Sequence, residues 1–154
     1  IDAKFGFALK SFSVSGNKIL GGGSGGGVLI SEDGGETWTM PDIIPSTSLY
    51  VLTTDGNNML VAGGYEGMII KSTDLGLSWK AVFASDGEHC PTIKDIDFVN
   101  SNVGYIARYN RMISKTTDGG ETWFTIFPDT SVTSYIFYGL DFVNEDLGYV
   151  VGKA

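Results

Sequence analysis

The sequence is poor in several features that define large classes of protein. Its 154 residues include a single cysteine, Cys90, so neither an internal disulfide nor a thiolate metal cluster can form. Only 10 lysines and arginines stand against 18 aspartates and glutamates, and the net charge of −8 disfavours nucleic acid and anionic lipid as partners. No apolar run reaches the ~18–20 residues of a membrane span. We therefore expect no nucleic-acid binding and no membrane insertion.

Proline is also scarce, with four residues, whereas glycine is abundant, with 22, and aromatic residues make up 12%. This composition is typical of many short strands joined by tight turns. No window shows a sustained apolar period of 3.6 residues, so we expect essentially no helix. The length suffices for one domain with a sizeable core.

Three segments of the chain repeat the pattern Ser/Thr-x-Asp-x-Gly-x-Ser/Thr-Trp. Their tryptophans are all the tryptophans of the chain, and they lie 41 and then 44 residues apart. Three octets in nearly constant register are strong evidence of a structural repeat. The octets are residues 31–38, 72–79 and 116–123.

The register extends beyond the octets. Residues 20–30 align without gaps on residues 61–71, and these align on 105–115 with a shift of 44. The glycine-rich run 21–27 keeps this register, so we interpret it as a native hairpin and not as a flexible linker. Residues 140–152 repeat a segment 44 residues upstream, and the chain therefore holds about three and a half units.

Each unit predicts four short strands. In the third unit, Ile96 and Phe98 alternate with Asp95 and Asp97, as in a strand with one apolar face. Units of about 40–45 residues with four strands are typical of β-propeller blades. The predicted fold class is all-β, a propeller of four-stranded antiparallel blades. We expect one domain over 1–154, with blades at about 8–41 (its last strand at 36–41), 48–83 and 93–127, and an incomplete blade at 136–154.

The octet lies in the turn between the third and fourth strands of each unit. Its aspartate can accept hydrogen bonds from backbone amides of the turn, its glycine permits a left-handed backbone, and its tryptophan can cover the space between sheets. Residues that recur in every unit serve a need of every unit, so we predict a structural role for them. They are Ser31, Asp33, Gly35, Trp38, Ser72, Asp74, Gly76, Trp79, Thr116, Asp118, Gly120 and Trp123.

The octet resembles the Asp-box, or BNR repeat, of sialidases, xyloglucanases, sortilin-type receptors and photosystem II assembly factors. The longer pattern, Phe-Val-Asn followed by Gly-Tyr and then the box, most resembles the photosystem II assembly-factor-like branch, which is widespread among secreted bacterial proteins. The resemblance covers residues 12–153, and the second octet departs from it at Leu75 and Leu77. Because this family spans enzymes, receptors and assembly factors, the resemblance implies the fold and leaves the function open.

The start at Ile1 without a signal peptide fits a processed or excised product, and we expect an extracellular or periplasmic setting. Three and a half blades do not close a ring of the four to eight blades seen in propellers. Further blades of a longer chain could complete the ring. Two copies could join head to tail as a homo-oligomer with seven blades, since twice three and a half is seven. Finally, residues 1–7 could add a strand that closes a ring of four.

Catalysis has little support in the residues. A sialidase site needs three arginines on the substrate carboxylate, and the chain offers only Arg108 and Arg111. Asp95 and Asp97 lie two apart on one strand, roughly 6.6 Å, which is loosely compatible with an inverting glycosidase pair. However, Asp97 recurs in the fourth unit as Asp141, which favours a scaffold role.

The adjacent His89 and Cys90 match no local signature of a cysteine nucleophile and are too few to bind zinc alone. We therefore predict no catalytic residue, no metal site and no cofactor.

Departures from the repeat are the better guide to binding. The strongest departures lie in the turns between the second and third strands. The resemblance places these turns on the face opposite the Asp-boxes, and the same face holds the connections between blades at 41–48, 84–92 and 128–134. We predict a mixed aromatic and charged patch there, typical of recognition surfaces. Its residues are Tyr65, Glu66, Arg108, Tyr109 and Arg111.

The predicted function is a non-catalytic binding or scaffold module that recognises a protein or a glycan through this patch. The alternative is a fragment of an Asp-box glycoside hydrolase, xyloglucanase- or sialidase-like, whose catalytic site is completed outside this chain.

Overall fold

The structure is a computed structural model that describes residues 6–41, 48–54, 60–74, 76–83, 91–109, 111–128 and 136–153. These residues form antiparallel strands and two single-turn 3₁₀ segments, η2 (Ser24–Gly26) and η3 (Tyr65–Gly67), with no α-helix among them. This confirms the predicted all-β class. Within the described ranges no helix is long and apolar enough to cross a membrane.

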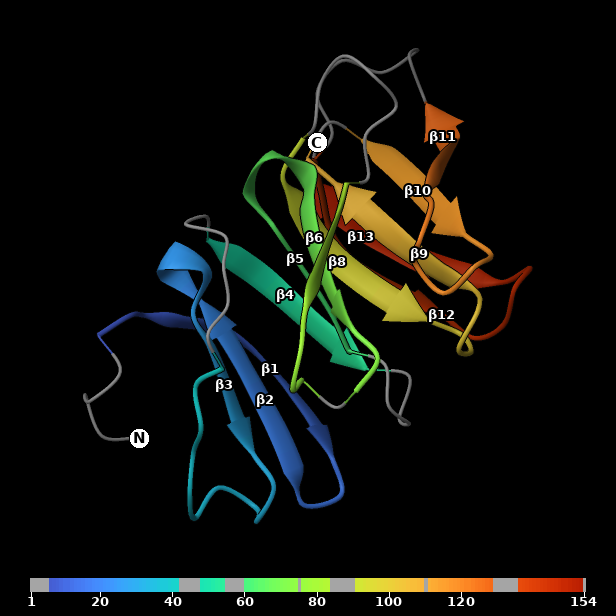
Figure 1. The fold of residues 1–154 in the computed structure, drawn as a ribbon. Helices are drawn as coiled ribbons and strands as arrows, with labels where there is room; N and C mark the ends of the chain where they lie inside the picture. Colours follow the sequence, from blue (N-terminus) through green and yellow to red (C-terminus); the bar gives the residue numbers. More distant parts are fainter. Residues whose placement is uncertain are drawn as a thin grey trace.

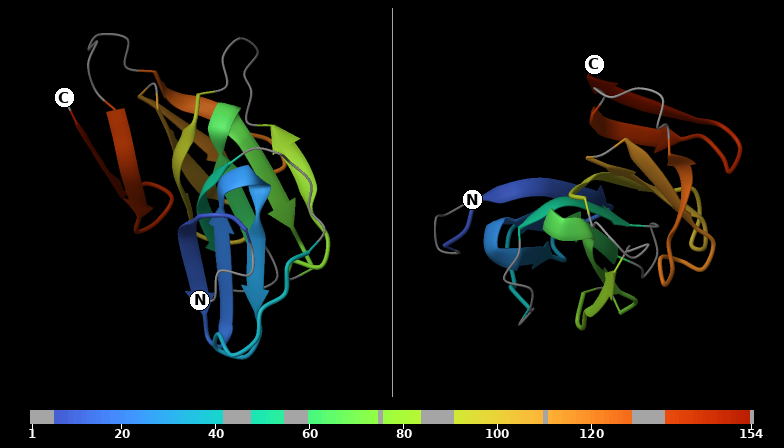
Figure 2. Two further views of the ribbon diagram at one scale, coloured as in Figure 1. Left: turned by 90° about the vertical axis from the view of Figure 1, so that its left-hand side faces the viewer. Right: turned by 90° about the horizontal axis from the view of Figure 1, so that it is seen from above.

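The strands form four sheets, each made of strands that are consecutive in the chain (Figure 1). Seen from above, the sheets follow one another in chain order around an arc (Figure 2), as the blades of a partial propeller do. The first strand of each sheet packs against the first strand of the next, so β1, β4, β8 and β12 form the inner row. The strands are β1 (Leu9–Ser15), β2 (Lys18–Gly23) and β3 (Val28–Ser31) in the first blade; β4 (Leu49–Thr54), β5 (Leu60–Gly64), β6 (Met68–Ser72) and β7 (Lys80–Phe83) in the second; β8 (Ile93–Phe98), β9 (Gly104–Arg108), β10 (Met112–Thr116) and β11 (Phe124–Pro128) in the third; and β12 (Ile136–Phe142) and β13 (Gly148–Lys153) in the last.

The first blade differs from its prediction in its outermost strand. Instead of a strand over 36–41, a single bridge joins Ile30 and Thr39, with N–H···O distances of 2.9 and 2.8 Å in the two directions. The next hydrogen-bonded pair of such a ladder would use the backbone N–H of residue 41. Residue 41 is proline, which has no N–H, so the ladder ends there.

The hydrophobic core lies between the blades. Leu20, Val28 and Ile30 of the first blade share one buried cluster with Leu49, Leu52 and Ile70 of the second. A second cluster joins the second and third blades, and a third joins the third and last. Each blade is therefore buried by its neighbours and not by a core of its own.

The glycine-rich segment 21–27 is part of this packing. It forms the end of β2, the turn η2 and the approach to β3, as a hairpin and not a linker. Gly22 is buried, and a Cβ at this position would lie 2.1 Å from Cδ1 of Leu52 in the second blade. Glycine is thus required here because the next blade approaches the backbone directly.

The three Asp-box turns have the same hydrogen-bond pattern. In the third, Oγ1 of Thr116 donates to Asp118 (2.8 Å) and accepts from the N–H of Gly120 (2.9 Å). The Asp118 carboxylate accepts from both the N–H and the hydroxyl of Thr122. Nε1 of Trp123 donates to the carbonyl of Gly120 (3.2 Å), whose φ is +87°. The same bonds recur at Ser31, Asp33, Gly35, Thr37 and Trp38, and at Ser72, Asp74, Gly76, Ser78 and Trp79.

The turn holds each tryptophan against the preceding blade. Trp123 is buried in the cluster between the second and third blades, and Trp79 packs on the cluster between the first and second. Trp38 is only half-buried, and the described residues include no blade before it. In the second and third blades, the rigid turn therefore fixes the tryptophan ring that packs the blade against the preceding one.

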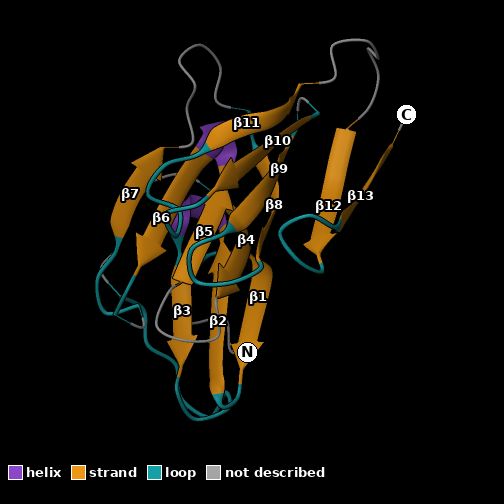
Figure 3. Ribbon diagram, turned by 90° about the vertical axis from the view of Figure 1, so that its right-hand side faces the viewer, coloured by secondary structure: helices purple, strands orange, loops and turns teal. Residues whose placement is uncertain are grey.

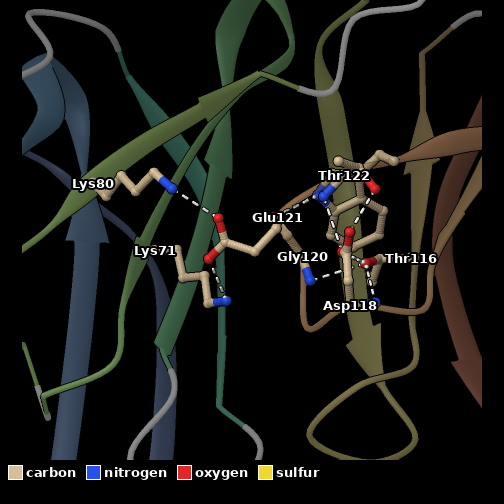
Figure 4. A network of polar contacts seen from close by, with 8 residues as sticks. Lys71, Lys80, Thr116, Asp118, Gly120, Glu121 and Thr122 are labelled. Carbon is tan, nitrogen blue, oxygen red and sulfur yellow. Dashed lines mark hydrogen bonds and ion pairs between the residues drawn. The ribbon is translucent and has the colours of Figure 1, made fainter.

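A charged bridge joins the same two blades beside the third Asp-box (Figure 4). Glu121 accepts from Nζ of Lys71 at 2.9 Å and from Nζ of Lys80 at 2.7 Å. Lys71 is nearly buried, whereas Lys80 and Glu121 reach solvent. The hydrogen bonds from Lys80 and Lys71 lower the pKa of Glu121.

Replacing Glu121 with glutamine should lower the free energy of unfolding by about 1–2 kcal/mol, because nearly buried Lys71 loses its counter-charge. Chemical denaturation at pH 7 measures this. Glu36→Gln is the matched control, since Glu36 holds the same place in the first Asp-box, before which the described residues include no blade. Equal effects of the two substitutions would contradict the bridge.

The Asp-box carboxylates predict a loss of stability in acid. Hydrogen bonds lower the pKa of Asp33 and of Asp74 to about 2. The hydroxyl of Thr37 has the largest effect on Asp33, and the hydroxyl of Ser78 has the largest effect on Asp74. Burial raises the pKa of Asp118, but its hydrogen bonds outweigh this and the pKa is also about 2. A pKa lowered by folding stabilises the protein above the unfolded value of 3.8, and this stabilisation is lost as the pH falls towards 2.

The melting temperature should therefore drop steeply between about pH 4 and pH 2. Asp118→Asn should melt lower at pH 7 and show a shallower decline across that window, because one of the titrating groups is gone. Thermal scans by circular dichroism between pH 2 and pH 7 test this. A variant whose decline is as steep as that of the wild type would show that Asp118 does not contribute.

Candidate functional site

The two ends of the sheets are built differently. The Asp-box turns follow β3, β6 and β10 at one end, whereas the turns between second and third strands lie at the other, where η2 and η3 are the purple segments in Figure 3. Each of these turns is tied to the start of the inner strand. The N–H of Ser24, Tyr65 and Tyr109 donates to the carbonyl of Ala8, Ser48 and Thr92, respectively. This end therefore joins inner strands and turns into one face.

The structure separates the predicted patch residues. Tyr65, Glu66 and Tyr109 are exposed on this face, and Arg111 is half-buried. Arg108 is not on the surface, because its residue is only 1% exposed. Its place at the end of β9, a central strand covered on both sides, buries it, so the prediction of Arg108 as a surface residue is corrected. The predicted connections 41–48, 84–92 and 128–134 lie largely outside the described residues, as do His89 and Cys90.

Two turn residues on this face have a left-handed backbone. Glu66 has φ of +54° and Arg111 has φ of +61°. The corresponding turn of the first blade has glycines at these positions, with φ of +67° and +79°. Such a backbone costs a side-chain-bearing residue about 1–2 kcal/mol, and strain of this kind concentrates at functional sites. In addition, Nη1 of Arg111 is buried with no hydrogen-bond partner among the described residues. Both positions hold a residue other than glycine although this lowers stability, which points to a role outside folding.

A row of residues that sequence reasoning missed lies beside these turns. The pairing of each inner strand with its neighbour skips one residue near the start of the strand, which makes a β-bulge. Bulges re-aim side chains and are frequent next to binding sites. The four bulge positions alternate between lysine and tyrosine in chain order, and all reach solvent. They are Lys10, Tyr50, Lys94 and Tyr138.

The bulge residues contact the turns directly. Nζ of Lys94 lies 5.6 Å from the ring centroid of Tyr50 in the preceding blade. It lies 5.4 Å from the ring centroid of Tyr109, which is in the turn between β9 and β10 of its own blade. Both distances are within the range of cation–π attraction. We define the binding face as Tyr50, Lys94 and Tyr109 with Tyr65, Glu66 and Arg111. The repeat register could have revealed Tyr50 and Lys94, because they occupy one position of the unit and 44 residues separate them.

Asp95 and Asp97 have a different environment from that of a catalytic pair. Oδ2 of Asp95 accepts from the N–H of Leu140 at 2.9 Å, and Oδ2 of Asp97 accepts from the N–H of Phe142 at 2.7 Å. Both carboxylates therefore join the third blade to the last, and Oγ of Ser11 accepts from the N–H of Leu52 in the same way between the first two. Burial raises the pKa of Asp95, against the effect of its backbone hydrogen bonds.

No metal site is assembled among the described residues. The aspartate and glutamate side chains of the described residues include no group of three or more that could hold a metal ion, and the single histidine and cysteine lie outside these residues. A small cavity of about 130 Å³ lies at the Asp-box end, lined by Lys71, Trp79 and Lys80 with Glu121. Its charged groups already pair with one another.

The blade-joining role of Asp95 can be tested with two substitutions. Asp95→Ala should lower the free energy of unfolding by about 1–3 kcal/mol, because the N–H of Leu140 loses its acceptor. Asp95→Asn should be as stable as the wild type at pH 7 or more so, since the amide oxygen still accepts and no charge is buried. That advantage should shrink in acid, where Asp95 is protonated. Urea denaturation at pH 7 and pH 4 measures both effects, and equal losses in both variants would contradict the assignment.

A family model described as BNR/Asp-box repeat matches residues 29–40, which contain the whole first octet. No curated protein is detectably similar to the chain in sequence. Among solved structures, YCF48 from Cyanidioschyzon merolae has a TM-score of 0.77 and 19% identity over 99% of this chain and 52% of that chain. The chain thus spans about half the length of that protein.

Two further structures have the same fold. The GH74 enzyme of Niastella koreensis has a TM-score of 0.65 and 22% identity over 94% of this chain and 26% of that chain. The computationally designed Ika4 protein has a TM-score of 0.67 and 15% identity over 96% of this chain and 91% of that chain. At these identities the likeness concerns the fold alone. The octets, the family-model match over residues 29–40 and the fold together show a partial β-propeller whose blades carry Asp-box repeats.

Proposed function

We propose that this chain is a non-catalytic binding module that recognises a protein partner through the binding face. The observation that carries the proposal is the position of Lys94 between Tyr50 and Tyr109. These three side chains come from two blades and face solvent, although nothing in the repeat requires them. Tyrosine and arginine are enriched among residues that dominate protein interfaces.

The charges of the binding face indicate the chemistry of the partner. Lys94 and Arg111 supply cations on a chain whose net charge is −8, so this face departs from the acidic character of the whole. The buried Nη1 of Arg111, which has no hydrogen-bond partner among the described residues, is a donor that a carboxylate could satisfy. We therefore propose a partner segment that bears carboxylate side chains.

The enzyme alternative has weaker support. GH74 enzymes share the fold, but Asp95 and Asp97 are engaged by backbone N–H groups of the last blade. A glycan is the second class of ligand to consider, because exposed tyrosines also stack on sugars.

Peptides selected from a phage-displayed library on the wild-type chain test this function. Calorimetry should give at least a tenfold weaker Kd for Lys94→Met and for Tyr109→Ala, about 1.4 kcal/mol each. Lys80→Met and Phe124→Ala are matched controls, since Lys80 lies at the Asp-box end and Phe124 on the outer strand β11 with the same exposure as Tyr109. Selected peptides should be rich in aspartate and glutamate.

Two outcomes would contradict the proposal. Peptides that bind the variants as tightly as the wild type would place the interface elsewhere. A parallel panel of oligosaccharides tests the other classes, because glycan binding without peptide binding would assign a carbohydrate ligand, and hydrolysis would assign an enzyme.

A further inference from the structure

The cavity at the Asp-box end has an excess of positive charge. It lies where the second and third blades meet, and the ammonium groups of Lys71 and Lys80 both point at the carboxylate of Glu121 (Figure 4). The two ion pairs measure 2.9 and 2.7 Å. Two cations thus share one anion, so one positive charge among the lining residues is left over, on a chain whose net charge is −8.

Lys71 has hydrogen-bond donors to spare. Its side chain is only 8% exposed, yet the carboxylate of Glu121 is its one acceptor among the described residues. An ammonium group has three N–H donors, and buried donors are normally paired. Two donors of this nearly buried residue, which lines the cavity, therefore remain for a further acceptor.

The preceding blade junction shows that the fold does not require these charges. The repeat register, with shifts of 41 and 44 residues, gives each of the three charged residues a counterpart where the first and second blades meet. The counterparts are all uncharged, and they are Ile30, Thr39 and Leu77. That junction packs nonetheless around its own buried cluster. Stability does not explain the second lysine either, since Lys80 is 70% exposed and exposed ion pairs contribute little.

We propose that this cavity is a binding site for an oxyanion, such as a carboxylate or a sulfate group. The oxyanion would accept from the spare N–H donors of Lys71 and from Nζ of Lys80, and would balance the charge that Glu121 leaves uncompensated. Hydrogen bonds between ammonium groups and oxyanions are among the stronger ones in proteins. The volume of about 130 Å³ has room for such a group.

The other lining residues determine how the oxyanion would be held. Thr73 is exposed at the rim, and its hydroxyl can donate to a bound group. Ser78 also lines the cavity, but its hydroxyl donates to Asp74 within the Asp-box turn, so we assign it no ligand contact. The half-buried Trp79 supplies an apolar wall. This wall suits the carbon atoms that carry a carboxylate or sulfate group.

The proposed oxyanion site is separate from the binding face. The cavity lies at the Asp-box end of the blades, and its lining residues include none of the six that define the binding face. The inference therefore goes beyond the proposed function, and either of the two can fail without the other.

An NMR titration of the ¹⁵N-labelled 154-residue chain tests the site, because each Asp-box holds one tryptophan whose indole N–H gives its own signal. Sodium acetate and sodium sulfate are the two probes, each added at constant pH and at an ionic strength held with sodium chloride. The indole signal of Trp79 should shift and saturate, whereas that of Trp38, in the first Asp-box, should not. The probe that saturates at the lower concentration distinguishes a carboxylate ligand from a sulfate ligand.

Substitutions at the three charged residues have opposite expected effects. Lys71→Met and Lys80→Thr should each weaken binding by about tenfold or more, because a charge-assisted hydrogen bond is lost. Glu121→Gln should bind more tightly, since it keeps both lysines and removes the competing carboxylate. Lys18→Met is the matched control for Lys71→Met and should bind as the wild type does. Lys18 is also nearly buried and pairs with Glu32 at 2.8 Å, near the first Asp-box.

Circular dichroism checks that each variant is folded. The absence of a saturable shift of the Trp79 signal with either probe would overturn the inference, and so would equal shifts of the Trp79 and Trp38 signals, which would show a general effect of salt. Weaker binding by Glu121→Gln would also contradict it. Lys80→Thr should still bind the selected peptides, which separates this site from the proposed function.

Discussion

The structure depends on the burial of each blade by its neighbours. A sheet of two to four short strands has no interior, so its apolar residues are removed from water only where the next blade covers them. The polar contacts follow the same rule, because Asp95, Asp97 and Glu121 all bond across a blade boundary. The Asp-box turn serves this constraint, since its internal hydrogen bonds fix a tryptophan ring against the preceding blade.

Residues that recur could be interpreted from the sequence. The octets gave the positions of the blades because a turn with this hydrogen-bond pattern needs the same residues each time, as at Thr116, Asp118 and Gly120. Residues that do not recur were harder. The fourth strand of the first blade is lost to the missing N–H of Pro41, a local effect that an averaged repeat hides.

The candidate site was predictable only in part. Exposed Tyr65 and Tyr109 follow from their place in a turn, but Arg108 ends a central strand, and charge alone suggested a surface position. Tyr50 and Lys94 were missed because a bulge shifts the register by one residue, which alternation counted along the strand cannot reveal. Asp95 and Asp97 show the same limit, since a strand pattern does not tell whether a carboxylate faces solvent or bonds to the next blade.

Under the proposed function, stability depends on one end of the blades and recognition on the other. At the Asp-box end the same side chains recur and satisfy one another, so there is little freedom to vary them. At the other end Glu66 and Arg111 keep a left-handed backbone that glycine would adopt without cost, and the bulges carry side chains that the fold does not require. Yet the contact of Lys94 with Tyr50 crosses a blade boundary. The binding face therefore exists only where two blades are packed together. Under the proposed function, the assembly of the arc is a condition for recognition as well as for burial.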